Sequence, residues 1–136
     1  MAQGKSYHLS RYGLNLLRVN AVISGYNQKS YQRVSLLLDT GSSFTVLPRP
    51  VLEHLGYNLK YPIRHQTITT GKGNTSALPV IEIHWFNCLG QLIENFEVVA
   101  YSIPNNIRVN GLLGMDFLTK TKAVIFIETG KISFNR

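Results

Sequence analysis

The sequence predicts a single, mostly β, closed barrel-like domain with one or two short helices. The chain has 136 residues, of which 44% are apolar and only 15% charged, as is typical of one globular domain. Apolar residues alternate with polar ones in several runs that are separated by turn-forming residues, which is the pattern of half-buried strands. Helical patterns are confined to two short segments, near Val51 and near Met115.

The first strand pair is predicted between residues 17 and 39. Apolar side chains alternate with polar ones over 17–23, a turn-rich segment follows at 25–30, and a returning strand covers 31–39. Residues 36–38 are apolar on both faces, so we expect this strand to be central in the sheet. The polar, mixed residues 1–12 are expected to form an N-terminal tail, and residues 13–136 the domain.

The remaining elements follow from proline, glycine and the alternation of apolar residues. A helix is expected over 51–55, with Pro50 at its first position and Gly56 as its stop. Two strands that flank the glycine-rich segment 71–74 predict a hairpin with a flexible tip. The expected strands after residue 39 are 44–47, 63–70, 76–85, 91–100, 123–128 and 131–135.

Asp39 is the first candidate for chemistry. It ends the apolar central strand, where a carboxylate loses hydration without an obvious basic partner nearby in the sequence, and such a position is costly unless the acid is used. Gly41 permits a sharp turn, and the hydroxyls of Thr40 and Ser42 can orient the carboxylate.

A second element supports this interpretation. Residues 109–118 read Val-Asn-Gly-Leu-Leu-Gly-Met-Asp-Phe-Leu, which is a pair of apolar residues followed by glycine and a short helix. Together with the Asp-Thr-Gly of residues 39–41, this element resembles the aspartic proteases. The resemblance covers about residues 14–134 and is closest to the single-domain, retropepsin-like branch, particularly its cellular and bacterial members.

The resemblance implies a retropepsin (acid protease) fold and an aspartic endopeptidase that hydrolyses peptide bonds. Its catalytic residues would be Asp39, Thr40 and Gly41. The sequence has only one other aspartate, Asp116, which lacks a following Thr-Gly and suits the first turn of a short helix. The second catalytic carboxylate must then come from a second copy, so a homodimer is expected, with the two Asp39 carboxylates sharing one proton and activating a water.

By the same resemblance, the hairpin around residues 71–74 is the flap that closes over a peptide or protein substrate. The residues expected to bind substrate are Ser42, Ile68, Gly71, Lys72, Gly73 and Leu113. Viral retropepsins carry an acid and an arginine at the positions of Ser43 and Met115. Both charges are absent here, so the ion pair has been replaced as a unit and no buried charge is left unpaired.

Composition limits the partners. The net charge is +7, but the basic residues are scattered, so no nucleic-acid partner is expected. Four histidines without paired spacing and a single cysteine, Cys88, predict no metal site, and no cofactor is expected. The first residues lack the apolar core of a signal peptide, and no apolar run is long enough to span a membrane, so we expect a cytoplasmic protein without membrane contact.

Three alternatives remain open at the level of sequence. The chain could be a non-catalytic dimeric peptide- or protein-binding module of the same fold, but binding alone does not require a desolvated acid pair. It could be a basic domain that docks on nucleic acid, which the dispersed charge disfavours. A serine hydrolase is disfavoured because residues 41–45, Gly-Ser-Ser-Phe-Thr, lack the closing glycine of the nucleophile elbow.

Overall fold

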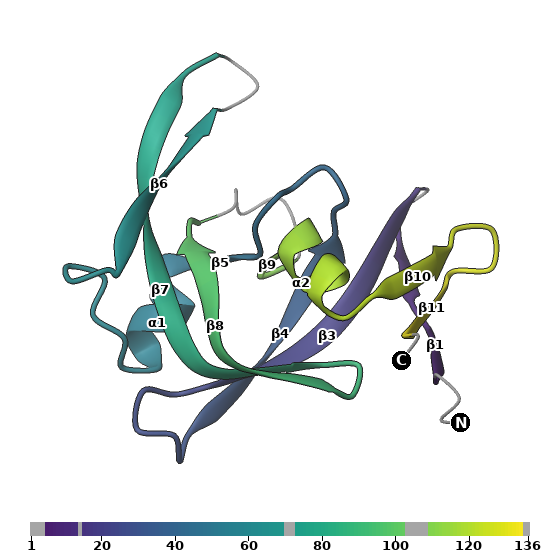
Figure 1. Ribbon diagram of the computed structural model, residues 1–136, viewed down its shortest axis with the longest axis horizontal. Coiled ribbons are helices and arrows are strands. Elements are labelled where there is room, and N and C mark those ends of the chain that lie inside the picture. Colours follow the sequence, from purple (N-terminus) through teal and green to yellow (C-terminus); the bar gives the residue numbers. More distant parts are fainter. Residues whose placement is uncertain (1–4, 14, 70–72, 103–108, 135–136) are drawn as a thin grey trace.

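The computed structural model describes residues 5–13, 15–69, 73–102 and 109–134. Six strands pair in a ring and close a barrel, as Figure 1 shows. In ring order they are β3 (Leu16–Ser24), β4 (Tyr31–Leu38), β9 (Gly111–Leu113), β5 (Val46–Leu47), β8 (Gln91–Ala100) and β7 (Thr75–Cys88), which pairs back to β3. The predicted mostly β, closed barrel is confirmed.

The hairpin of β3 and β4 provides one wall of the core. Its antiparallel register places Val19 opposite Leu36 and Ala21 opposite Val34, and all four side chains are buried. Period-two alternation in the sequence therefore predicted this wall correctly. Strand β4 also pairs with β9, in parallel, so it is central, as its apolar end indicated.

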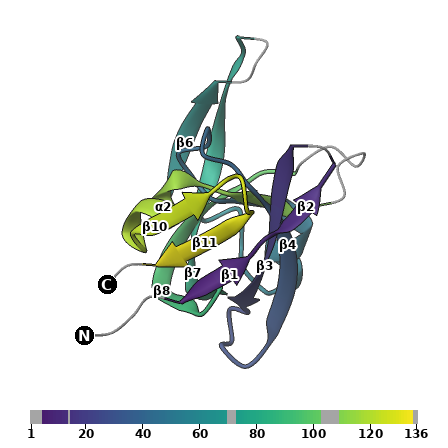
Figure 2. The same cartoon turned by 90° about the vertical axis from the view of Figure 1, so that its right-hand side faces the viewer.

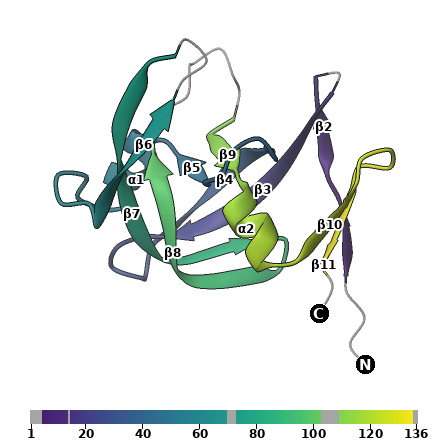
Figure 3. The same cartoon turned by 45° about the horizontal axis from the view of Figure 1, so that its top comes forward.

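The β6–β7 hairpin extends beyond the barrel, as Figures 1 and 3 show. Strand β6 (Arg64–Thr69) pairs with β7 from Arg64 opposite Val80 to Thr69 opposite Thr75. Ile63 N donates to Val80 O, so the polar backbone groups of Val80 face β6 and those of Pro79 face the other side. The β7–β8 ladder begins only at Val80. Pro79, which has no N–H to donate, therefore lies where β8 offers no hydrogen-bond partner.

A separate three-stranded sheet lies beside the barrel (Figure 2). It consists of β1 (Ser6–His8), β11 (Lys131–Phe134) and β10 (Ala123–Phe126), with β11 paired on both sides. Residues 6–12, which the sequence analysis assigned to a tail, thus form β1 and also β2 (Ser10–Tyr12), which pairs with β3. The reason is packing. Tyr7 lies edge-on to Phe134 with ring centroids 6.0 Å apart, and Leu9, which connects β1 to β2, is buried.

Two short helices contribute buried side chains to the main core. Helix α1 (Arg49–His54) has proline in its first turn and buries Leu52, and α2 (Met115–Lys120) buries Phe117 and Leu118. The ring of Phe117 packs edge-on against Phe86 and Phe134, which joins α2, the barrel and the terminal sheet in one core. No helix among the described residues has the length and apolar character needed to cross a membrane.

Candidate active site

Asp39 directly follows β4 and is fixed by its backbone. Its N–H donates to Leu113 O at 3.0 Å, which continues the β4–β9 pairing, and its carbonyl accepts from Ser42 N at 3.1 Å. The side-chain oxygen Oδ1 accepts from Gly41 N at 2.9 Å. The half-buried carboxylate is therefore held by its own turn, with Thr40 and Gly41 exposed beside it.

The turn is anchored to the start of α2. Ser42 Oγ donates to Phe44 O at 2.7 Å, and Met115 N donates to Ser42 O at 2.8 Å. A Cβ added at Gly114 would overlap the carbonyl of Phe44, and one added at Gly111 would overlap the Val46 carbonyl. The two glycines of the second motif are thus required because the chain leaving the Asp39 turn passes directly against them.

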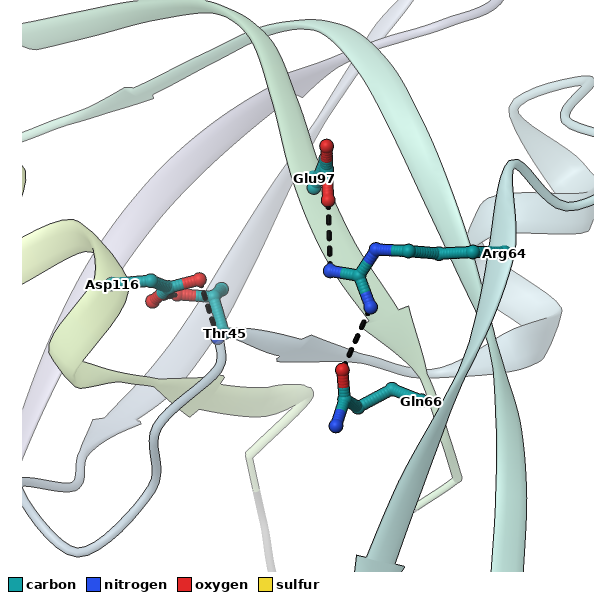
Figure 4. Close-up of polar contacts among 5 residues, drawn as sticks. All are labelled: Thr45, Arg64, Gln66, Glu97 and Asp116. Carbon is teal, nitrogen blue, oxygen red and sulfur yellow. Dashed lines mark hydrogen bonds and ion pairs between the residues drawn. The ribbon is translucent and has the colours of Figure 1, made fainter.

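A link that sequence reasoning missed joins Thr45 to Asp116. The two Asp116 carboxylate oxygens accept from Thr45 N at 2.9 Å and Thr45 Oγ1 at 2.8 Å (Figure 4). Oδ1 also accepts from Phe117 N at 2.7 Å. Thr45 Oγ1 in turn accepts from Gly114 N at 3.2 Å. Asp116 does lie in the first turn of α2, as predicted, but its carboxylate is engaged in holding the active-site segment in place.

The expected substrate-binding residues fall into three groups. Ser42 belongs to the Asp39 turn, and Ile68 is half-buried on β6. Gly73 is exposed at the hairpin with φ of +81°, whereas Gly71 and Lys72 lie outside the described residues. Leu113 is fully buried in the main core, and its neighbour Leu112 is half-buried on the opposite face of β9.

Leu112 is part of a second, smaller apolar cluster between the hairpin and the Asp39 turn. Its buried floor is formed by three valines from three neighbouring strands. The side chains that border this floor are only half-buried, so part of their apolar surface remains exposed. The members of this second cluster are Val46, Val80 and Val99 in the floor and Phe44, Ile68, Leu78 and Leu112 around it.

Other reactive side chains are not gathered here. Cys88 is buried in the main core, where burial raises the pKa of its thiol to about 12, so it is a packed thiol rather than a nucleophile. Within the described ranges, no three His, Cys, Asp or Glu side chains lie close enough together to hold a metal ion. What the arrangement offers is one oriented carboxylate at an exposed turn, beside an open apolar cluster.

Comparison with known proteins agrees with this geometry. The family model described as aspartyl protease matches residues 19–117, which include both the Asp39 turn and the second motif. The chain belongs to the aspartyl protease family. A comparison with curated protein sequences finds no match.

Two solved structures show that this aspartyl protease has a retropepsin-like fold. One is a retropepsin-like aspartic protease from Rickettsia conorii, with a TM-score of 0.68 and 19% identity, covering 99% of this chain and 96% of that one. The other is the retroviral protease-like domain of Ddi1 from Leishmania major, with a TM-score of 0.57, 17% identity and 90% coverage of both chains. The predicted resemblance to the retropepsin-like branch is confirmed.

Proposed function

We propose that this aspartyl protease is an endopeptidase that hydrolyses peptide bonds as a homodimer, with one Asp39 from each copy. The observation that carries the proposal is the contrast between the only two aspartates. Asp116 has both carboxylate oxygens occupied by Thr45 and Phe117, whereas the Asp39 carboxylate lies in an exposed turn and keeps an oxygen that no described donor engages. Because Asp116 is engaged in this way, a second free aspartate is supplied only by a second copy of the chain.

In the proposed mechanism, the two Asp39 carboxylates share one proton because two like charges in contact do not both ionise readily. The ionised carboxylate takes a proton from water, which attacks the carbonyl carbon of the peptide bond, while the protonated one donates to the carbonyl oxygen. When the C–N bond breaks, the leaving nitrogen receives a proton from the carboxyl that served as base, and the other carboxylate takes a proton from a hydroxyl of the tetrahedral intermediate, which restores the shared proton. Because one proton must be present, the rate is expected to fall at both acidic and alkaline pH.

The neighbouring residues are assigned supporting roles. Thr40, exposed beside Asp39, would hydrogen-bond the backbone of the other copy, and Gly41 would offer its carbonyl to the substrate. The tip residues Gly71, Lys72 and Gly73 would close over the substrate as a lid. The open second cluster supports apolar side chains next to the cleaved bond, so its members Ile68 and Leu112 are proposed as pocket walls, in place of the buried Leu113.

The decisive experiment compares wild type with Asp39→Asn on an unbiased peptide library. An amide cannot shuttle the proton, so cleavage is expected to disappear while circular dichroism and thermal unfolding remain close to wild type. Glu94→Gln is the matched control, because it makes the same chemical change at an exposed position on β8 and should cleave normally.

Two outcomes would contradict the proposal. Cleavage by Asp39→Asn at the wild-type rate would mean that another group or a contaminant acts. Peptide binding by the wild-type protein without cleavage at any pH would support the non-catalytic binding module of the same fold.

A further inference from the structure

Arg64 makes three contacts that converge on its guanidinium group. Nη2 pairs with Glu97 Oε1 at 2.9 Å, and Nη1 donates to Gln66 Oε1 at 2.7 Å. The guanidinium carbon also lies 6.0 Å from the centre of the Phe44 ring. Figure 4 shows the Arg64 guanidinium between the side chains of Gln66 and Glu97.

The strand register shows what the ion pair connects. Arg64 lies opposite Val80 on β7, and Val80 lies opposite Val99 on β8. Glu97 precedes Val99 by two residues, so Glu97, Val99 and Val80 share a face of the sheet. The Arg64 side chain therefore crosses β7, a span of about 10 Å between the first and third of three neighbouring strands, and ties the edge strand β6 to the barrel.

Phe44 connects this ion pair to the Asp39 turn. Its carbonyl accepts from Ser42 Oγ within that turn, and its ring borders the second cluster together with Ile68 of the hairpin. The guanidinium thus contacts the root of the hairpin, a barrel strand and the chain that leaves Asp39. A planar, forked cation can serve these partners at once, which a lysine ammonium cannot.

We propose that Arg64 is a positioning residue that fixes the root of the β6–β7 hairpin relative to the Asp39 turn. The inference rests on the proposed function, since the hairpin matters for catalysis only if substrate binds beneath it. With the root held, less ordering is required when the hairpin closes on a substrate, so substrate binding benefits more than the chemical step.

The expected effect is modest and depends on salt. The side chains of Arg64 and Glu97 are 42% and 46% exposed, and exposed ion pairs are weak and screened by salt. Loss of the pair should therefore change the local opening of the hairpin root and leave global unfolding nearly unaltered.

The test measures amide hydrogen exchange and peptide kinetics in Arg64→Met, Arg64→Lys, Glu97→Gln and the Arg64→Met/Glu97→Gln double variant. Arg64→Met keeps a long apolar stem but loses charge and donors. Exchange at residues 64–69 and 75–80 should rise roughly two- to fivefold in this variant, which corresponds to the small free energy that an exposed ion pair contributes. Exchange in β3 and β4 should stay unchanged. KM should rise by a similar factor with kcat nearly constant, and Arg64→Lys should restore only part of the effect.

The double variant distinguishes a coupled pair from two separate side chains. If the pair acts as a unit, the double variant exchanges no faster than Arg64→Met, and 0.5 M salt reduces the difference from wild type. Unchanged exchange in Arg64→Met, or strictly additive effects in the double variant, would overturn the inference. If exchange behaves as expected but the wild-type protein cleaves nothing, the link stands and the proposed function fails.

Discussion

At Gly114, the backbone of Phe44 fills the space that a Cβ atom would need. Gly114→Ala is therefore expected to destabilise the fold by about 2 to 3 kcal/mol, because backbone and not a flexible side chain must move. Urea unfolding measures this change. The neighbouring Met115→Ala is the control, since Met115 is 39% exposed and its truncation should cost less than about 1 kcal/mol. Equal effects in the two variants would contradict the packing argument.

Cys88 provides a second prediction at this scale. Its side chain is 1% exposed, Sγ lies 3.6 Å from Asn20 O, and desolvation raises its pKa from 9.0 to about 12. The native protein should therefore resist iodoacetamide at pH 8 and react fully in urea, as mass spectrometry would show. The stability contributed by the buried neutral thiol is present below pH 9.0 and is lost as pH rises toward about 12. In this range the thiol ionises in the unfolded chain but stays neutral in the folded protein, so rising pH favours unfolding. Rapid alkylation of the native protein would contradict this burial.

At the scale of elements, the Thr45–Asp116 contact joins α2 to the chain after the Asp39 turn. Asp116→Ala removes the acceptors for Thr45 N, Thr45 Oγ1 and Phe117 N, and Thr45 is fully buried. We expect a loss of about 2 to 3 kcal/mol, since buried donors are left unpaired. Asp116→Asn is the control: one oxygen remains an acceptor, so its loss in urea unfolding should be smaller. An equal loss in both variants would show that charge, and not hydrogen bonding, is what matters.

Elements with a long repeating pattern were predictable from sequence, whereas the three-residue strands β1, β2 and β9 were not. The alternation along β3 and the apolar end of β4 predicted the barrel wall and the position of Asp39. Strands β1 and β2 have three residues each and are stabilised by pairing with distant β11 and nearby β3, so no local period indicated them. Likewise, the three residues of β9 are too few to decide from sequence that Leu112, rather than Leu113, faces the second cluster.

The Thr45–Asp116 contact was hidden from sequence analysis for a different reason. The two residues are 71 positions apart, and Asp116 already had a sufficient local explanation in the first turn of a helix. The two segments meet through tertiary contacts, including the pairing of β5 with β9 and the bond from Met115 N to Ser42 O. One signal was present in the sequence. Viral retropepsins join these two segments by an ion pair, and the neutral Ser43 and Met115 stand at its positions here. Other side chains must therefore connect the segments in this protein.

For the whole molecule, the proposed homodimer gives a prediction about Thr40. Its hydroxyl is proposed to bond across the two-fold axis, so each dimer contains the contact twice. Thr40→Val should raise the dimer dissociation constant by roughly tenfold or more, because two hydrogen bonds worth about 1 kcal/mol each are lost. Thr40→Ser keeps the hydroxyl and should leave the dissociation constant close to wild type. Sedimentation velocity over a dilution series, with activity measured on the same samples, provides the test. Full specific activity in a purely monomeric sample would contradict the dimer.

Strand pairing in the terminal sheet limits how that sheet could contribute to the dimer. Strand β11 is paired with β1 on one side and β10 on the other, so its own edges are already occupied within one chain. To extend this three-stranded sheet, a second copy would pair with the outer edge of β1 or β10. At the end of β10, Phe126 and Ile127 are exposed apolar residues that a second copy could cover.

The pairing of β1 with β11 also sets an order on folding. Ser6 lies opposite Ser133, so this contact closes a loop that includes nearly the whole chain. The β10–β11 pair closes only a short turn, and short loops form faster and at a lower entropic cost. We therefore expect β10 and β11 to pair early and β1 to join them late, which would make the docking of β1 a slow step that reports completion of the native state.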